Sequence, residues 1–350
     1  MQNYKIMPRW ALAAAAAFAI LPITGMASAE DYPKLTLTHA TGLNENYPLA
    51  EATTRFNEQV AKESGGNIEI KMFWGGALGG LKEALDIVSK GAVDIADIVP
   101  GYFNTQLPLQ SMTNALPHTF FDPNQAMYAL VDMSENNPLQ IKEFKDANVK
   151  PLIFRALGTY YFLCTKPVKT MEDFKGLKVR SFGAYMPKMM EALGATPVNV
   201  VISDAYEAMK RGSLDCTYSP GSDHAAFKLY EVAKNLINLP MGGIAAYTDS
   251  MNLAKFNSLD KNTQDLLVRA GKDATDWWAS QVDANEKAAI DTMLADGVQW
   301  VEFEETDKFR AVMPDMLSLW QQSMTERGLE DVGKQYSEAL MGYYNAHKSK

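Results

Sequence analysis

Residues 174–220 read FKGLKVRSFGAYMPKMMEALGATPVNVVISDAYEAMKRGSLDCTYSP, and this stretch decides the fold class. A short apolar run ends at Arg180, and two helical segments follow before a strand begins at Cys216. Such alternation predicts an α/β architecture, in which ligands bind beyond the carboxyl ends of the strands. Arg180 lies at such an end, and a guanidinium there takes a carboxylate with two parallel hydrogen bonds. Taken alone, the same Arg also suits a surface ion pair.

An earlier segment has the same layout. Residues 81–90 form a predicted helix that a glycine follows, then an apolar-Asp pair, a strand and the Pro-Gly turn at 100–101. Residues 204–211 begin the same series, which ends at the Pro-Gly turn at 220–221. Basic residues and glycine favour a helix end, and Pro-Gly favours a turn. Helix-Gly-strand is also common in any α/β protein, but the repeated cluster favours two similar lobes.

Two such lobes would face each other across a cleft. By the rule for strand ends, we expect residues 99–103 to line one side of it and residues 218–223 the other. Residues 259–296 read as one long helix with Ser258 as its N-cap, and this helix is long enough to brace both lobes. The other predicted strands are Leu35–His39, Ile68–Phe73, Pro151–Phe154, Tyr160–Thr165 and Leu177–Arg180.

The N-terminus has the pattern of a secretory signal peptide. Lys5 and Arg9 precede an apolar run from Ala11 to Ile23, and Ala27-Ser28-Ala29 is a small-x-small cleavage site. We therefore expect cleavage after Ala29 and export to the periplasm, because the apolar run is short for a membrane-spanning helix.

Charge and cysteine content restrict the partners. The chain has a formal net charge of −9, and loss of Lys5 and Arg9 takes the exported form to about −11. This field repels nucleic acid and anionic membranes, so we expect neither as a partner. The two cysteines, Cys164 and Cys216, are compatible with a disulfide in an oxidising compartment and equally with two buried thiols.

Signatures of catalysis and of metal binding are largely missing from the sequence. The four histidines lack metal-ligand spacing, no G-x-S-x-G motif occurs, and the Gly-rich segment at 74–83 lacks the Lys-Ser/Thr of a P-loop. Aromatic residues instead gather near predicted strand ends, where a tyrosine offers both a ring wall and a hydroxyl group. The aromatic binding candidates are Trp74, Tyr102, Tyr160, Phe182 and Tyr218.

Several blocks, in order between about Leu35 and Phe309, resemble the solute receptors of TRAP (tripartite ATP-independent periplasmic) transporters. They are GGALGG-helix-KGAVDIA, PVKTMEDFKGLKVR, GATPVNVVISDAYEAMKRGSLDCTYSP and LYEVAKNL, the last read as a helix over 229–236. The resemblance implies a two-lobed periplasmic binding protein fold of α/β class, with hinge strands and a long lobe-spanning helix. It also implies small and large integral-membrane permease subunits as partners, no catalysis and no cofactor.

The resemblance also implies roles for residues. Arg180 matches the family arginine that clamps the ligand carboxylate, and Ser219 stands where many relatives carry Asn. Tyr160 stands where many relatives carry a second basic residue, which favours a monocarboxylate with an apolar, aromatic or cationic remainder over a dicarboxylate or a polyhydroxy sugar acid. The full set of ligand-binding candidates is Arg180, Tyr160, Ser219, Tyr218, Phe182, Trp74, Tyr102, Asp223 and His39.

The expected domains follow from the lobes. They are a signal peptide (1–29), lobe I (30–157 and 245–284), lobe II (158–244 and 285–320) and a C-terminal helical segment (321–350). Four alternatives stay open: a receptor for a cationic solute held by the aromatic wall, a receptor for an ATP-driven importer, a sensory protein, and a secreted enzyme that uses Asp97 or Asp223.

Overall fold

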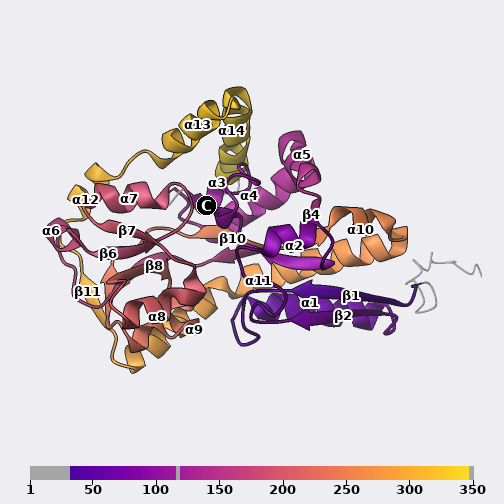
Figure 1. The fold of residues 1–350 in the computed structure, drawn as a ribbon, viewed down its shortest axis with the longest axis horizontal. Helices are drawn as coiled ribbons and strands as arrows, with labels where there is room; N and C mark the ends of the chain where they lie inside the picture. Colours follow the sequence, from indigo (N-terminus) through magenta and orange to yellow (C-terminus); the bar gives the residue numbers. More distant parts are fainter. Residues whose placement is uncertain (1–31, 116–118, 347–350) are drawn as a thin grey trace, which may run out of the picture.

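The structure, a computed structural model, describes residues 32–115 and 119–346. Two mixed sheets lie side by side, each flanked by helices (Figure 1). The predicted signal peptide lies outside the described residues. Within the described part of the chain, no helix has both the length and the apolar character needed to cross a membrane.

The first sheet has five strands. Four of them run in one direction, while β10 runs antiparallel to both of its neighbours, β3 and β4. In spatial order the strands are β2 (Ile68–Phe73), β1 (Leu35–Ala40), β3 (Ile95–Ile98), β10 (Ile244–Asn252) and β4 (Val149–Leu157).

The second sheet has six strands. β7, β6 and β8 are parallel, and β5 runs antiparallel to both β8 and β9. In spatial order the strands are β11 (Gln299–Glu302), β9 (Asn235–Asn238), β5 (Tyr160–Cys164), β8 (Cys216–Pro220), β6 (Lys178–Ser181) and β7 (Thr196–Asn199). This two-sheet architecture confirms the predicted α/β class.

The repeated sequence layout reflects a repeated structural device. Gly91 and Gly212 have φ angles of 72° and 71°, and they end α2 (Ala84–Ser89) and α8 (Ala205–Lys210). Glycine adopts these left-handed angles without steric cost. The aspartate that follows each glycine then accepts a hydrogen bond from a neighbouring strand: Asp94 Oδ2 from Thr38 N at 2.7 Å, and Asp215 Oδ2 from Lys178 N at 2.8 Å.

The chain passes between the sheets three times, twice from strand to strand and once through α11 (Lys261–Ala295), which leads from β10 to β11. β4 continues into β5 through residues 158–159, and β9 continues into β10 through residues 239–243. Helix α11 contacts α1 (Ala50–Glu63) and β4 on one side and α9 (Gly221–Ala226) on the other (Figure 1). We call the first sheet with its helices the first half and the second sheet with its helices the second half. The long helix thus contacts both halves, as expected, while the exact lobe boundaries stay a prediction.

Two local predictions were wrong. The N-cap of the long helix is Asp260, whose carboxylate accepts from Thr263 N at 3.0 Å, whereas the Ser258 hydroxyl bonds Lys255 O. Residues 229–236 are not a helix. They form a short 3₁₀ turn, η4 (Leu229–Glu231), and the start of β9, because Leu236 pairs with Leu163 of β5 and gains ladder hydrogen bonds there. Helix α2 also begins three residues later than expected.

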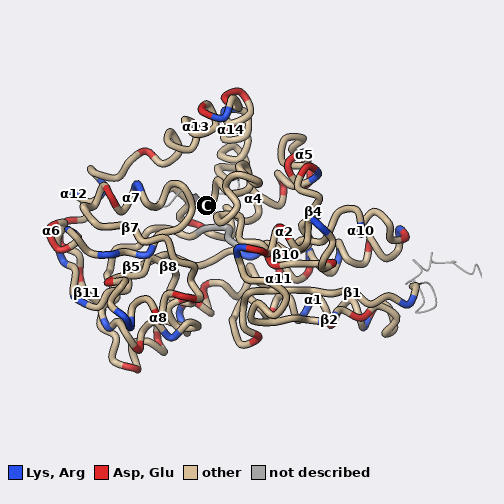
Figure 2. Tube along the Cα trace, in the orientation of Figure 1, with Lys and Arg blue, Asp and Glu red and all other residues tan. Residues whose placement is uncertain are grey.

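The remaining helices lie around the sheets. Tyr344 of α14 stacks edge-on against Phe120, with ring centroids 5.0 Å apart, so the C-terminal helix packs on the first half. Charged residues of both signs are interspersed over both halves (Figure 2). These helices are α3 (Met112–Ala115), α4 (Pro123–Asn136), α5 (Pro138–Asp146), α6 (Met171–Phe174), α7 (Met186–Ala192), α10 (Leu253–Ser258), α12 (Thr306–Val312), α13 (Met316–Glu326) and α14 (Glu330–Ala346), with 3₁₀ turns η2 (Pro100–Tyr102) and η3 (Ile202–Asp204).

The cysteines form a disulfide. Cys164 of β5 and Cys216 of β8 stand opposite each other in the antiparallel ladder, and their Cα atoms are 4.1 Å apart. The sequence left this pairing open, and strand order decides it.

Candidate functional site

Arg180 is buried at the carboxyl end of β6, with 2% of its surface exposed. Its Nε donates to Val200 O at 3.0 Å, and Nη1 donates to Tyr218 O at 3.1 Å and to Ser219 Oγ at 3.2 Å. Nη2 donates to the Tyr102 hydroxyl at 3.3 Å. All four partners are neutral oxygens. Within the described part of the chain, no carboxylate lies within ion-pair distance of this guanidinium.

Asp223 is a second buried charged residue beside Arg180. It lies in the first turn of α9, and its Oδ2 accepts from Ser219 Oγ at 3.0 Å while Oδ1 accepts from the Tyr47 hydroxyl. Ser219 therefore bridges Arg180 and Asp223. Burial raises the pKa of the Asp223 carboxyl, although hydrogen bonds and the positive charge of Arg180 oppose this shift. Three sequence candidates, Arg180, Ser219 and Asp223, thus form one polar cluster. We call its two charged residues the Arg180–Asp223 pair.

Aromatic rings surround this pair. Tyr160 and Tyr218, on adjacent strands, have ring centroids 5.0 Å apart, and Tyr102 meets Phe182 edge-on at 5.6 Å. The Phe182 ring centroid lies 5.0 Å from the Arg180 guanidinium carbon. The structure therefore brings together the four aromatic candidates Tyr102, Tyr160, Phe182 and Tyr218.

Two further tyrosines belong to the same region. Burial and the nearby negative charge of Asp223 raise the pKa of Tyr47 and of Tyr247 well above the usual value. Tyr47 follows β1, so the strand-end rule applied to the first predicted strand would have found it. Tyr247 lies on β10, opposite Arg155, and no local pattern indicates that this strand returns to the first sheet.

Residues of the first half reach the second half at this site. The Tyr47 hydroxyl bonds Asp223, and the Tyr102 hydroxyl bonds Arg180. Gly183 comes so close to Gly101 that a Cβ added to Gly183 would lie 3.2 Å from Gly101 O. The two halves are thus in contact around the Arg180–Asp223 pair.

His39 lies elsewhere in the first sheet, in a buried ionic cluster. Arg155 of β4 donates to Asp97 Oδ1 at 2.5 Å and to Asp249, and His39 Nε2 is 3.8 Å from Asp249 Oδ2. Burial lowers the pKa of His39 to about 3, so the imidazole is neutral, and burial raises the pKa of Asp97 to about 6. This cluster joins β3, β4 and β10, and sequence reasoning did not foresee it.

Trp74 follows β2, the edge strand of the first sheet, and is half-buried. No described contact joins Trp74 to Arg180 or Asp223, so its binding role stays a prediction.

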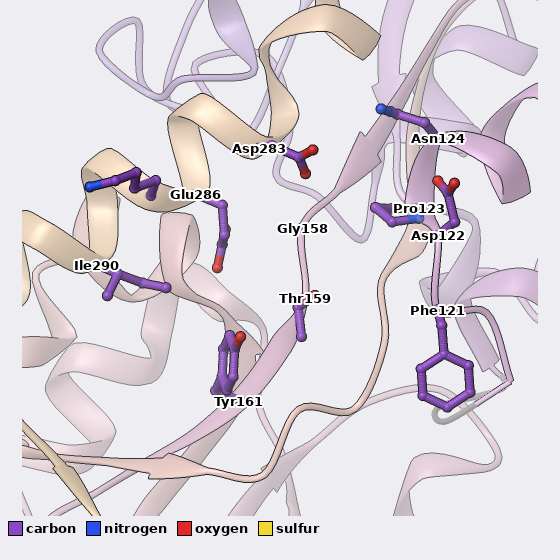
Figure 3. Close-up of a pocket in the computed structure, with 11 residues that line it drawn as sticks. Phe121, Asp122, Pro123, Asn124, Gly158, Thr159, Tyr161, Asp283, Glu286 and Ile290 are labelled. Carbon is purple, nitrogen blue, oxygen red and sulfur yellow. The ribbon is translucent and has the colours of Figure 1, made fainter. Parts of the chain in front are cut away.

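A separate pocket lies beside the first crossing between the halves (Figure 3). It has a volume of about 710 Å³, and Gly158, Thr159 and Glu286 are among its lining residues. Glu286 of α11 accepts from the backbone N–H groups of Gly221 and Ser222, at the start of the helix that carries Asp223. Burial raises the pKa of Glu286 to about 7. Glu286 therefore holds α9 against the long helix.

The described residues offer no sign of a metal centre: no group of three or more His, Cys, Asp or Glu side chains among them is placed to hold an ion. The geometry suits recognition of a small charged molecule.

Comparisons with known proteins agree on the kind of protein. Residues 39–327 match the family model described as bacterial extracellular solute-binding protein, family 7 (DctP). A solute-binding protein of Sulfitobacter sp. is 26% identical, with 85% of this chain and 89% of that protein aligned. The C4-dicarboxylate-binding periplasmic protein DctP of Rhodobacter capsulatus is 24% identical, with coverages of 80% and 83%.

Solved structures share the fold. A TRAP solute-binding protein of Rhodoferax ferrireducens, in complex with copurified benzoate, aligns with a TM-score of 0.80 at 23% identity, over 89% of this chain and 98% of that one. A TRAP periplasmic solute-binding protein of Sulfitobacter sp., with bound β-D-galacturonate, gives a TM-score of 0.75 at 21% identity, over 89% and 99%. The chain therefore belongs to the bacterial extracellular solute-binding protein family 7, whose members are not enzymes but the solute receptors that work with the membrane permease subunits of TRAP transporters.

Proposed function

We propose that the protein captures a small monocarboxylate, whose carboxylate binds Arg180. The remainder of the solute packs against Tyr102, Tyr160 and Tyr218, which we call the tyrosine wall. The observation that carries this proposal is the set of partners of Arg180. A buried guanidinium normally pairs with an anion, yet its described hydrogen bonds go to carbonyl and hydroxyl oxygens. A ligand carboxylate that displaces the Tyr102 hydroxyl would give Arg180 an anionic partner.

The wall argues against a second carboxylate on the ligand. The family resemblance places Tyr160 where many relatives carry a basic residue, and Tyr160 is buried against Tyr218. Relatives with solved structures hold benzoate in one case and galacturonate in another, each with a single carboxylate, and galacturonate belongs to the polyhydroxy sugar acids that Tyr160 disfavours here. A compact monocarboxylate is consistent with this arrangement.

Binding proceeds by closure of the two lobes, with residues 30–157 and 245–284 in one and residues 158–244 and 285–320 in the other. The closed lobes then present the solute to the permease subunits. The Tyr47–Asp223 and Tyr102–Arg180 contacts are the bonds that closure forms between them. We also propose that export removes residues 1–29, which the mass of the periplasmic protein would test.

A panel of organic acids that includes benzoate, galacturonate and glucuronate tests the proposal, with binding measured by thermal shift and calorimetry. Arg180→Ala should weaken carboxylate binding by about 30-fold or more, since breaking one side of a buried charge pair costs about 2–5 kcal/mol. Arg211→Ala, which removes an exposed charge of the same lobe, is the matched control. Equal affinities in wild type and Arg180→Ala would refute the clamp.

A further inference from the structure

The Arg180–Asp223 pair bears on the class of solute. Resting on the proposed function above, we propose that the solute is zwitterionic, with a carboxylate that binds Arg180 and an ammonium group that binds Asp223. The juxtaposition that carries this inference is one buried cation and one buried anion, separated by the hydroxyl of Ser219.

Charge balance is the first argument. Arg180 and Asp223 are 2% and 3% exposed, and an ionised Asp223 balances the positive charge of Arg180. A simple monocarboxylate would bring an uncompensated negative charge into the closed site, and buried uncompensated charges are strongly unfavourable. A zwitterion adds no net charge and gives each buried group a partner of opposite sign.

In the described part of the chain, the other buried arginine near the first sheet is already paired. Arg155, the buried arginine of the first sheet, is bonded to two aspartates, Asp97 and Asp249. His39 beside them is neutral, because burial lowers its pKa to about 3. Arg155 is therefore already paired with carboxylates of its own sheet, so the arginine available to a ligand carboxylate in the described cluster is Arg180.

Asp223 also has acceptor capacity for an ammonium group. A carboxylate offers about four acceptor positions, and its described bonds are one to the Tyr47 hydroxyl and one to the Ser219 hydroxyl. Burial raises the pKa of Asp223 in spite of these bonds, and an ammonium group bonded directly to the carboxylate would favour its ionised form.

The tyrosines near Asp223 favour a cation as well. The Tyr47 hydroxyl bonds Asp223, and the negative charge of Asp223 also raises the pKa of Tyr160 and of Tyr247. Aromatic faces attract ammonium groups, most strongly where water is excluded. The hydroxyl groups of a uronate would fill the acceptor positions of Asp223 but would leave its charge uncompensated.

Matched pairs of compounds test the proposal. Each pair shares a carboxylate and differs by one ammonium group: L-phenylalanine and 3-phenylpropionate, L-leucine and 4-methylpentanoate, 4-(aminomethyl)benzoate and 4-methylbenzoate. The mature protein is titrated with each, in two buffers of different ionisation enthalpy, so that calorimetry reports both affinity and proton uptake. Asp223→Asn keeps the side-chain shape, and Asp204→Asn, at an exposed position of the same lobe, is the control.

We expect at least one ammonium-bearing compound to bind more than tenfold tighter than its partner, without proton uptake. Asp223→Asn should weaken the binding of that compound by about 30-fold or more and leave the binding of the plain acid unweakened. Asp204→Asn should change neither affinity. The plain acid, where it binds, should take up a proton in wild type and none in Asp223→Asn.

Two results would overturn the proposal. One is that plain acids bind as tightly as their ammonium-bearing partners, and the other is that no ammonium-bearing compound binds. If plain acids still bind and depend on Arg180, the receptor function stands and the zwitterion inference alone fails. Binding of amines that lack a carboxylate, unaffected by Arg180→Ala, would refute the proposed carboxylate clamp instead.

Discussion

Reduction of the Cys164–Cys216 disulfide should strongly destabilise the protein. The bond closes a loop with a sequence separation of 52 residues. In the chain-entropy description of cross-links, opening a loop of this length costs about 4 kcal/mol of unfolding free energy. The bond also lies at one end of the β5–β8 ladder, and the pairs Tyr160–Pro220 and Tyr161–Ser219 lie at the other end. The disulfide therefore helps to hold the register of two strands that carry binding candidates.

Guanidinium unfolding of the oxidised protein, compared with protein refolded and kept in a phosphine reductant, measures this effect. We expect a lower midpoint for the reduced form, equivalent to about 4 kcal/mol. The double variant Cys164→Ala/Cys216→Ala should be insensitive to reductant, which controls for effects of the reductant itself. Equal midpoints for the oxidised and reduced wild type would refute the reasoning, as would two reactive thiols in protein purified from the periplasm.

Two other substitutions test the helix that contacts both halves. Glu286 has a pKa raised to about 7, so its contribution to folding is present below the unfolded-state pKa of about 4.5 and is lost as pH rises to 7. The unfolding free energy of the wild type should fall between pH 5 and 7.5, and Glu286→Gln should reduce this fall by up to about 3 kcal/mol. Urea unfolding at each pH measures it, and the same pH dependence in wild type and variant would contradict the assignment. Gly271→Ala should cost at least about 1–3 kcal/mol, because its Cβ would lie 2.3 Å from Leu152 O, whereas Gly342→Ala, with open space around it, should stabilise by up to about 1 kcal/mol. Equal melting temperatures of these two variants would show that the α11–β4 contact relaxes freely.

Much of the fold followed from local patterns. The strand predicted at 68–73 matches β2, and the glycines at 91 and 212 do end helices. These features depend on side-chain alternation and on backbone angles, which neighbouring residues control. The two wrong assignments arose where local signals competed. Asp260 was the better cap than Ser258, and residues 229–236 gained more from pairing with β5 than from helix formation.

The binding candidates divide in the same way. Arg180 and Tyr218 were identified because strand ends in α/β folds point to a cleft, and the structure places both beside Asp223. Tyr247 and the Arg155 cluster were missed, because they come from β4 and β10, whose partnership depends on the second crossing of the chain between the sheets.

The sequence by itself determined the α/β class, the family and the position of Arg180, because these depend on short motifs and on strand and helix periodicity. Only the tertiary structure decided that Cys164 bonds Cys216, that Tyr47 meets Asp223 across the two halves, and that Ser219 separates the two buried charges. The physical reason is that these contacts join segments as far as 176 residues apart. Their formation depends on strand order and on how the two sheets approach each other, which no local pattern specifies.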